Sequence, residues 1–259
     1  MVKNSTRRWR AQVAAALFTT FSSGFLLLHA LPLHALPLTI NTEEYPPFNY
    51  AGEQGQIIGS ATEQLRKALR QTDTDAYFRL LPWARAYTEA RLRDHYCVYS
   101  TARTREREAL FQWVGPLAVN EWAAFSLAER GLNITELSEL RAWRVGSYRE
   151  DAIGDYVAAL GITVLRAPTE RENIARLKAG LIDVIVTGKA TGEFMAAEQN
   201  IGLAHLFTFA RSPLYLACHP SVSEALLVRL QSQLDALHTD VQDDAQNVQD
   251  VKNTQKDKP

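Results

Sequence analysis

The sequence lacks the common signatures of catalytic and metal-binding sites. It contains no G-x-S-x-G nucleophile motif, no H-E-x-x-H helix, no Walker loop and no G-x-G-x-x-G turn. After residue 36 the histidines are His95, His205, His219 and His238, and their spacing does not fit a set of metal ligands. We therefore expect no cofactor and no metal site.

The sequence also lacks an excess of positive charge. Its 28 basic and 29 acidic residues give a formal net charge of −1, but four of the bases, Lys3, Arg7, Arg8 and Arg10, lie in the first ten residues. Without those four, 24 basic residues stand against 29 acidic ones, which leaves a balance of −5. Bulk positive charge is what attracts proteins to nucleic acid and to anionic membranes. We therefore expect neither as a partner, and small molecules recognised by local contacts remain.

Cysteine is nearly absent, because only Cys97 and Cys218 occur. They allow at most one disulfide within the chain. Each cysteine lies in an apolar stretch, which is equally typical of two buried thiols. A bond between them is possible in an oxidising compartment, but the sequence does not give the Cα separation that decides it. Both alternatives stay open at this point.

The first 36 residues have the pattern of a secretory signal peptide. The four bases precede residues 11–42, which contain no charged residue and hold an apolar core between Leu17 and Leu28. Cleavage after Ala30 or Ala35 fits this pattern, so we predict export to the periplasm. An uncleaved membrane anchor is the alternative, because the apolar stretch is nearly long enough to span a bilayer.

The last residues, 239–259, contain almost no large apolar side chains and are rich in Asp, Gln, Asn and Lys. Such a segment buries too little apolar surface to offset the conformational entropy that it loses on folding. We therefore predict a disordered tail.

Between these two ends, short β-rich runs alternate with helical patterns, which indicates an α/β fold with parallel sheets covered by helices. Capping boxes predict helix starts at Ser60, Thr169 and Ser221, each followed by Glu three residues later. A stripe of leucines from Leu226 to Leu237 predicts a last amphipathic helix. Strands are predicted over residues 38–42, 76–81, 96–101, 143–147, 163–166, 184–187 and 214–218.

Four segments carry a resemblance to a known family. They are TEEYPPFNY at residues 42–50, LPWARAY at 81–87, YSTARTREREALF at 99–111, and a helical turn from residue 137 that leads into RVGS at 144–147. With these segments in this order, the chain resembles the extracytoplasmic solute-binding proteins of family 3. That family includes the periplasmic amino-acid receptors of ABC importers, and the resemblance covers nearly all of residues 38–238.

The resemblance implies a periplasmic-binding-protein-like type II fold, in which two α/β lobes are joined by a two-strand hinge. The first lobe would comprise residues 37–117 and 213–238, and the second lobe residues 118–212. A small solute would bind in the cleft between the lobes and be enclosed by hinge closure. Such a protein would be a monomer that delivers an amino-acid-like solute to an inner-membrane ABC permease or to a sensor.

The resemblance also implies roles for individual residues. Arg107 matches the family position whose guanidinium binds the ligand carboxylate, a pairing favoured by two parallel charge-assisted hydrogen bonds. Tyr45 and Trp83 match aromatic walls around the ligand, and Ser147 and Tyr148 fall at the matching loop of the second lobe. The structural alternatives are a solvated charge for Arg107, a core position for Trp83 and an ordinary turn for residues 147–148.

Two positions depart from the family pattern. Ala102 stands where amino-acid receptors of the family commonly carry a hydroxyl that helps to bind the carboxylate, although Ser100 is close, and both are candidate ligand-binding residues. Gly188 stands where an acid usually meets the α-ammonium group of the ligand. A buried ammonium group without a partner is costly, so this departure argues against an α-amino acid. Glu43 or Glu44 is the alternative source of negative charge.

A few enzymes share this fold, among them a dehydratase that acts on cyclic, prephenate-like acids. A cyclohexadienyl-dehydratase-like lyase is therefore the alternative function. Such an enzyme needs a general acid in the cleft, and Gly188 removes the second-lobe position suited to one. We predict a binding protein, not an enzyme, that captures a small carboxylate-bearing polar solute.

Overall fold

The computed structural model describes residues 37–238 of the 259-residue chain. The predicted signal peptide and the predicted C-terminal tail lie outside the described residues. Among residues 37–238, no helix is long and apolar enough to cross a membrane. Helices and strands alternate along the chain, which confirms the α/β class predicted from the sequence.

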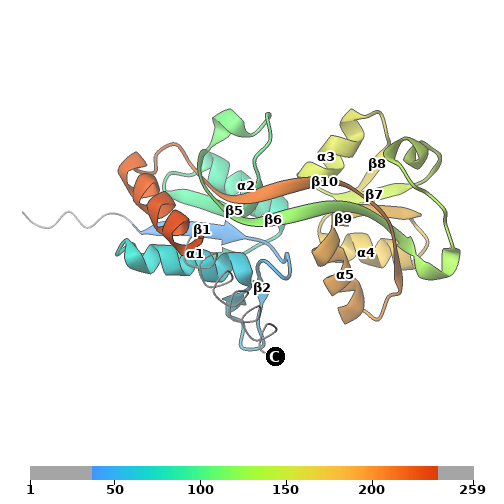
Figure 1. Cartoon of the computed structure of the whole chain (residues 1–259), viewed down its shortest axis with the longest axis horizontal. Coiled ribbons are helices and arrows are strands. Elements are labelled where there is room, and N and C mark those ends of the chain that lie inside the picture. Colours follow the sequence, from blue (N-terminus) through green and yellow to red (C-terminus); the bar gives the residue numbers. More distant parts are fainter. Residues whose placement is uncertain (1–36, 239–259) are drawn as a thin grey trace, which may run out of the picture. The chain divides into compact units, whose positions relative to one another are not determined.

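A single eight-stranded sheet connects all the larger elements, with the strand order β4-β1-β5-β10-β6-β9-β7-β8. Its centre consists of two 16-residue strands, β6 (Gln112–Leu127) and β10 (Leu203–Cys218), which pair antiparallel along their length. Figure 1 shows the two strands side by side between two groups of elements. The C-terminal part of β10 pairs with β5, whereas the C-terminal part of β6 pairs with β9. We call the group around β5 the first lobe and the group around β9 the second lobe.

The first lobe is built on parallel strands covered by helices. Its elements are β1 (Leu38–Thr42), the β2–β3 hairpin (Tyr50–Ala51 and Ile57–Ile58), α1 (Ser60–Gln71), β4 (Ala76–Leu80), α2 (Trp83–Leu92), β5 (Tyr96–Ala102), the 3-10 turn η1 (Glu108–Leu110) and a last helix over residues 224–238. Strand β1 pairs in parallel with both β4 and β5. Helix α1 buries Ala61, Leu65 and Ala68, which share one helical face. This face packs on the sheet together with Leu230 and Leu234 of the last helix.

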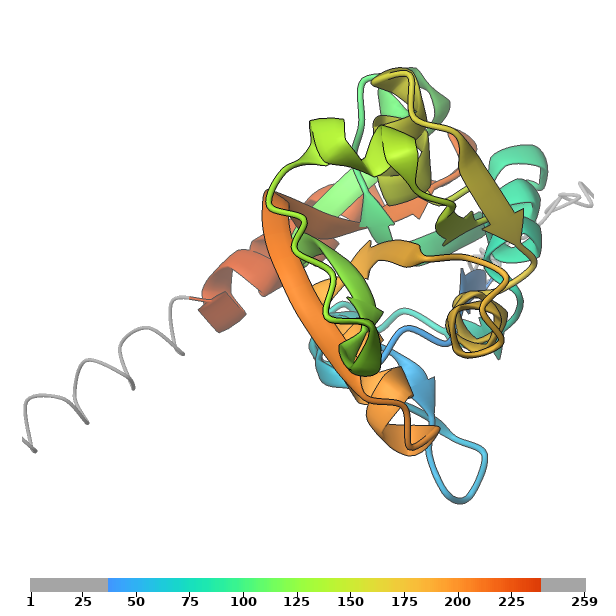
Figure 2. The same ribbon diagram turned by 90° about the vertical axis from the view of Figure 1, so that its right-hand side faces the viewer.

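The second lobe repeats this design, and Figure 2 looks onto it. Its elements are η2 (Ala128–Arg130), η3 (Leu137–Ala142), β7 (Val145–Tyr148), α3 (Ala152–Ala159), β8 (Val164–Ala167), α4 (Glu170–Lys178), β9 (Val184–Gly188) and α5 (Lys189–Glu198). Strand β7 pairs in parallel with β8 and β9. All five residues of β9 are buried, as expected for a strand covered on both faces.

One apolar cluster joins the two lobes. Trp83 and Tyr87 of α2 belong to the same buried cluster as Tyr148 at the end of β7 and Ala167 at the end of β8. The contact between the lobes is therefore apolar next to α2. The lobe boundaries at residues 117 and 213 stay a prediction.

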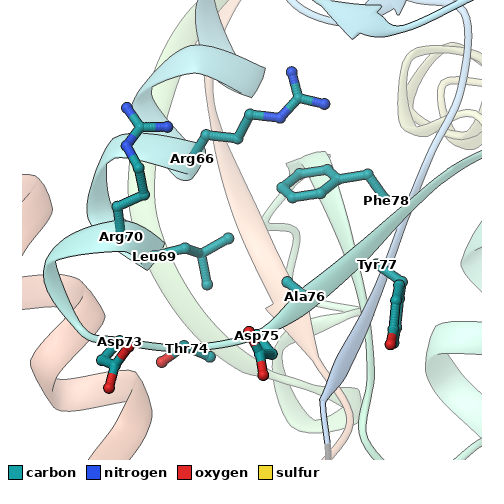
Figure 3. A pocket seen from close by; sticks show the side chains of 9 residues that line it. All are labelled: Arg66, Leu69, Arg70, Asp73, Thr74, Asp75, Ala76, Tyr77 and Phe78. Carbon is teal, nitrogen blue, oxygen red and sulfur yellow. The ribbon is translucent and has the colours of Figure 1, made fainter.

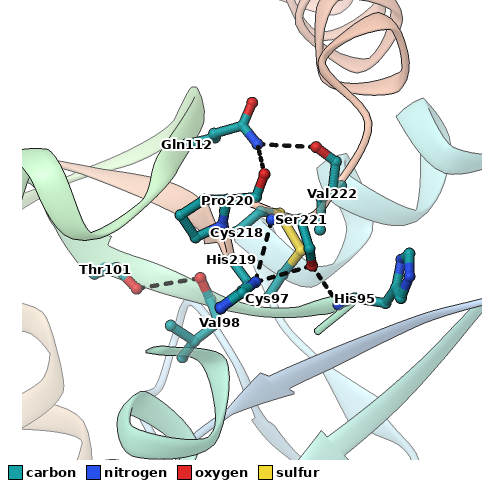
Figure 4. The surroundings of a disulfide bond; sticks show 10 residues. All are labelled: His95, Cys97, Val98, Thr101, Gln112, Cys218, His219, Pro220, Ser221 and Val222. Carbon is teal, nitrogen blue, oxygen red and sulfur yellow. Dashed lines mark hydrogen bonds between the residues drawn. A yellow bond between two sulfur atoms is a disulfide. The ribbon is translucent and has the colours of Figure 1, made fainter. Parts of the chain in front are cut away.

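The two cysteines are joined by a disulfide that ties β5 to β10 (Figure 4). Cys97 and Cys218 lie opposite each other in this antiparallel pair, with their Cα atoms 4.0 Å apart. Of the two alternatives that the sequence left open, the structure has the disulfide. The bond spans a sequence separation of 121 residues, so it links the first lobe to the strand that returns from the second.

Two parts of the sheet differ from the predictions. The predictions missed β6 and the first part of β10, because polar residues and prolines interrupt the apolar pattern of both strands. Asn120 and Glu121 interrupt β6 where it passes between the lobes, and Arg211 to Pro213 do the same in β10, opposite them in the register. Backbone pairing between the two strands keeps them extended where neither lobe supplies an apolar core.

One of the three predicted caps forms. The Thr169 hydroxyl accepts a hydrogen bond from the Glu172 backbone N–H at 3.3 Å. Helix α1 begins at Ser60 as predicted, but the capping box does not form, because Gly59 with φ of 120° holds the N-cap position and a Cβ there would lie 2.4 Å from the Phe48 carbonyl oxygen. The prediction for Ser221 is wrong, because its hydroxyl accepts from the His95 backbone N–H and the last helix begins at residue 224.

Replacing both cysteines, with Cys97→Ser and Cys218→Ser, should lower the stability of the folded protein and leave its fold unchanged. Cross-linking a loop of this length typically adds about 2–4 kcal/mol. For a domain of roughly 200 residues, each kcal/mol shifts Tm by about 2–4 °C. Thermal unfolding followed by circular dichroism measures the effect.

A reductant should lower the Tm of the wild type by a similar amount and should leave the Tm of the double variant unchanged. Equal Tm values for the oxidised wild type and the double variant would show that the bond does not stabilise the fold.

Candidate functional site between the lobes

The ends of several strands meet around a small cavity between the lobes. The cavity is bounded by residues that follow β1 and β4, that end β5 and β7, and that begin α3. Open α/β sheets place ligands beyond the carboxyl ends of their strands. The cavity has a volume of about 20 Å³, enough for about one water molecule. Its lining residues are Glu43, Tyr45, Trp83, Ser100, Ala102, Arg107, Asn120, Trp122, Tyr148, Asp151, Ala152, Ile153 and Leu214.

Six of the seven predicted ligand-binding residues line this cavity. They are Tyr45, Trp83, Ser100, Ala102, Arg107 and Tyr148. The seventh, Ser147, does not line it. The Ser147 side chain is fully buried and its hydroxyl donates to Asp151 Oδ2 at 2.6 Å, so Ser147 supports a lining residue from behind.

Arg107 lies between the lobes with 5% of its surface exposed. Its Nη1 donates to the Ala102 carbonyl oxygen at 3.3 Å, and its Nη2 donates to the Glu150 carbonyl oxygen of the second lobe at 2.6 Å. The guanidinium carbon lies 5.6 Å from the ring centroid of Trp83 and 5.0 Å from that of Tyr87. Arg107 forms no salt bridge with any residue in the described part of the chain.

Trp83 supplies a second hydrogen-bond donor to the Glu150 carbonyl oxygen. It is the first residue of α2, is 4% exposed, and donates from Nε1 to the Glu150 carbonyl oxygen at 2.7 Å. Glu150 has φ of 60°, in the left-handed region, which turns the loop after β7. Two donors of the first lobe, on Arg107 and Trp83, therefore converge on one oxygen atom of the second lobe.

Tyr45 and Ser100 form the floor of the cavity on the first-lobe side. The Tyr45 hydroxyl oxygen accepts a hydrogen bond from Asn120 Nδ2 at 2.7 Å, and Asn120 belongs to the crossing strand β6. The Ser100 hydroxyl donates to Asn49 Oδ1, and Ser100 itself has φ of 57° within β5. Hydroxyl groups thus surround the space in front of Arg107.

Three buried carboxyl groups, those of Glu43, Asp151 and Glu170, lie near the cavity. The sequence pointed to only one of them, since Glu43 was an alternative source of negative charge for the ligand. Glu43 accepts a hydrogen bond from the Tyr148 hydroxyl at 3.0 Å, across the lobes. Asp151 caps α3 by accepting from the backbone N–H groups of Ile153 and Gly154. Glu170 is the first residue of α4 and is 1% exposed.

Burial sets the protonation of these groups. It raises the pKa of Glu43 well above its ordinary value, and the negative charges of Asp151 and Glu170 raise it further. It also raises the pKa of Asp151, although the Arg107 charge opposes this shift. Burial raises the pKa of Glu170 to about 8. Glu170 is therefore largely neutral near pH 7, which makes it a candidate functional group.

Gly188 is tightly enclosed at the end of β9. A Cβ atom at this position would lie 2.5 Å from Tyr45 Oη and 2.7 Å from Asn120 Oδ1. The Tyr45 hydroxyl and the Asn120 amide thus fill the space that a side chain at position 188 would need. An acid at this position would force the Tyr45 and Asn120 side chains to shift in the arrangement of the lobes seen here, so glycine fits the packing around it.

Two larger cavities share lining residues with the small one. A cavity of about 410 Å³ shares Arg107, Trp122 and Ala152 with it, and a cavity of about 280 Å³ shares Glu43 and Trp83 with it. A further cavity of about 660 Å³, lined by α1, β4 and the loop between them, shares no lining residue with the small cavity (Figure 3).

Solved structures of similar fold include binding proteins and a sensor domain. The chain is similar to a histidine kinase sensor domain with similarity to periplasmic binding proteins, with a TM-score of 0.73 and 19% identity over 83% of this chain and 95% of that chain. It is similar to the arginine-bound form of truncated ArgBP from T. maritima, with a TM-score of 0.70 and 17% identity over 77% of this chain and 95% of that one.

A third similar structure is ArtJ, the arginine-, lysine-, histidine-binding protein of Geobacillus stearothermophilus, with a TM-score of 0.69 and 16% identity over 79% of this chain and 90% of that one. No family model and no curated protein matches the chain. The structural likeness establishes the fold, which is the periplasmic-binding-protein-like type II fold predicted from the sequence.

Raising the pH should destabilise the protein through Glu170. The pKa of this group is about 8 in the folded protein and ordinarily 4.5, so between these values the folded state binds more protons than the unfolded state. Stability then falls as the pH rises through this window. The substitution Glu170→Gln keeps the position neutral and should make the fall shallower, as measured by urea unfolding at about pH 5, 7 and 9.

Glu43 and Asp151 contribute a fall of the same sign in both proteins, so the difference between the two profiles isolates position 170. Glu172→Gln is the matched control, because Glu172 is half-buried on the same helix and pairs with Arg176; it should keep the wild-type profile. Parallel profiles for the wild type and Glu170→Gln would contradict the burial cost at Glu170.

Proposed function

We propose that the protein is a periplasmic solute-binding protein that captures a small, carboxylate-bearing polar molecule between its two lobes. The observation that carries this proposal is the convergence of the Arg107 and Trp83 donors on a single oxygen atom in the interlobe space. A solute carboxylate presents the same kind of acceptor together with a negative charge. Charge-assisted hydrogen bonds of this type are shorter and stronger than those to a neutral carbonyl.

Binding of such a solute requires the lobes to move. The space in front of Arg107 measures about 20 Å³, which is too small for a molecule of several heavy atoms. A carboxylate that reaches Arg107 takes the place of the Glu150 carbonyl, and the second lobe shifts accordingly. The solute would thus alter the arrangement of the lobes through contacts that differ between the two arrangements, as a conformational signal requires.

The solved neighbours support a binding role over a catalytic one. ArtJ and ArgBP are named for the amino acids that they bind, and an amino-acid-like solute is consistent with the buried acids around the cleft of the present chain. Delivery to an inner-membrane ABC permease follows from the resemblance in the sequence. A sensory role is the second candidate, because a sensor domain is among the similar structures.

Arg107→Ala should weaken solute binding and leave the fold intact. A hydrogen bond to a charged group contributes about 1.5–3 kcal/mol, so the loss corresponds to roughly 10- to 150-fold in affinity. A thermal-shift screen against amino acids, dicarboxylates, polyamines and aromatic acids finds the ligand, and calorimetry then compares the variants.

Arg105→Ala is the control, because Arg105 is exposed two residues away and should bind as the wild type does. Equal affinities for the wild type and Arg107→Ala would refute the carboxylate assignment.

The substitution Trp83→Phe tests the Nε1 hydrogen-bond donor of Trp83 separately from the packing of its ring. The variant keeps an aromatic ring beside Arg107 but loses the Nε1 donor, so we expect a loss of roughly 2- to 13-fold in affinity, equivalent to one hydrogen bond of about 0.5–1.5 kcal/mol. Tm should fall modestly as well, because the variant loses a buried hydrogen bond to Glu150 and part of a buried ring. If Trp83→Phe lowered Tm strongly while it left calorimetric affinity unchanged, Trp83 would be a core residue only.

A further inference from the structure

The cavity of about 410 Å³ between the lobes has the size of a solute. Small-molecule sites in proteins usually measure about 300–1,000 Å³, whereas the space in front of Arg107 measures about 20 Å³. The two cavities share Arg107, Trp122 and Ala152. A molecule that lies in the larger cavity can therefore reach the guanidinium.

One face of helix α3 forms the second-lobe wall of this cavity. The lining residues Ala152, Asp155, Tyr156 and Ala159 follow one another at intervals of one, three or four residues along the chain. Residues three and four apart are neighbours on a helix surface, so these side chains share one side of α3. The opposite side of the helix is buried in the core of the lobe. The two alanines are short, which leaves room beside the Tyr156 ring.

Tyr156 is a partly exposed aromatic residue that other rings hold in place. It is 42% exposed. Its ring stacks on Phe209 with an interplanar angle of 9°, and its centroid lies 5.6 Å from that of Trp122. Trp122 belongs to the crossing strand β6 and also lines the cavity. A ring fixed in this way offers contact to a second ring at little cost in side-chain entropy.

Tyr87 of α2 adds an aromatic ring from the first lobe. It lines the cavity next to Arg107, whose guanidinium carbon lies 5.0 Å from the Tyr87 ring centroid. Tyr87 is only 4% exposed, yet its hydroxyl forms no hydrogen bond with another residue of 37–238. Buried polar groups are normally paired. A molecule in the cavity would supply the missing partner.

The charged residues around the cavity differ in burial. Arg107 is the only buried one among them, and it forms no salt bridge in the described part of the chain. Asp155 is exposed and pairs with Arg166 at 2.7 Å, and Glu106 is exposed and accepts a hydrogen bond from Thr104. The cavity therefore combines one buried positive charge with aromatic walls.

We propose that this cavity binds an aromatic ring of the solute, and that the solute is an aromatic carboxylate. The proposal rests on the function proposed above, in which the carboxylate takes the place of the Glu150 carbonyl at Arg107. Glu150 also lines the cavity, so the position of the carboxylate adjoins that of the ring. Because Gly188 supplies no acid for an α-ammonium group, such a solute needs no amino group.

The test compares 3-phenylpropanoate with 3-cyclohexylpropanoate, two carboxylates of equal carbon number that differ in the nature of the ring. The saturated ring is the more apolar of the two, so burial of apolar surface alone would favour it. Contact between aromatic rings favours 3-phenylpropanoate instead. In calorimetry at neutral pH, we expect the wild type to bind 3-phenylpropanoate about 5-fold tighter or more.

Tyr156→Leu should reduce this preference to less than about 2-fold, because it removes the aromatic ring and keeps an apolar side chain. Tyr156→Phe is the matched control, since it keeps the ring and should retain the preference of the wild type. The Tm of each variant shows whether it folds.

Ala159→Phe tests the cavity itself and decides the question if Tyr156→Leu does not fold. Ala159 is an exposed lining residue of α3, so a phenylalanine there should fill part of the cavity and leave the fold intact. We expect it to lower the affinity for 3-phenylpropanoate about 10-fold or more. Ala158→Phe is the control, because Ala158 is exposed on the same helix but does not line the cavity; it should bind as the wild type does.

The outcomes separate the ring site from the proposed function. Equal affinities of the wild type for the two acids, with binding lost in Arg107→Ala, would overturn the ring site and leave the carboxylate site in place. The same follows if the wild type binds neither acid but binds another carboxylate of the screen. A preference that persists in Tyr156→Leu, or wild-type affinity in Ala159→Phe, would also overturn the ring site. Failure of every carboxylate to bind the wild type would overturn both proposals together.

Discussion

A guanidinium group that forms no salt bridge with any residue of 37–238 lies between the two lobes. Arg107 is almost fully buried, yet it donates to two neutral carbonyl oxygens and lies against the rings of Trp83 and Tyr87. A buried cation is costly unless negative charge compensates it. Here Glu43 and Asp151 act only through space, and burial favours their neutral forms. The charge of the guanidinium is thus only weakly compensated by the residues around it, and the proposed function depends on this property.

Some contacts of the site lie within one lobe, and others join the two lobes that β6 and β10 connect. The hydrogen bond from Arg107 to Ala102 lies within the first lobe, whereas the bonds from Arg107 to Glu150 and from Tyr148 to Glu43 join the lobes. If the lobes separated about β6 and β10, as the proposed function requires, the first bond would remain and the other two would break. The same guanidinium therefore has one fixed acceptor and one exchangeable acceptor. An anion competes only for the second, which couples its binding to the position of the lobes.

The sequence predicted the α/β class, most strand positions and six residues that line the cavity, because these follow from local patterns and family motifs. It did not predict β6, since Asn120 and Glu121 make a strand that crosses between two cores look like a loop. It also did not reveal the buried state of Asp151 and Glu170. Asp and Glu at helix starts are ordinarily solvated, and their burial here is set by tertiary packing that a local pattern does not encode. Within the second lobe, the Ser147 hydroxyl donates to Asp151 and therefore does not line the cavity.

Gly188 provides no carboxylate at the end of β9, so the acids near the interlobe space are found elsewhere. The Tyr45 hydroxyl and the Asn120 amide occupy the space that a side chain at position 188 would need at the end of β9. The buried acids Glu43 and Glu170 come from opposite lobes, and burial favours the neutral form of both near the interlobe space. The charge of Arg107 is therefore only weakly compensated by the residues around it, and an anion that reached this guanidinium would supply the negative charge that these residues do not.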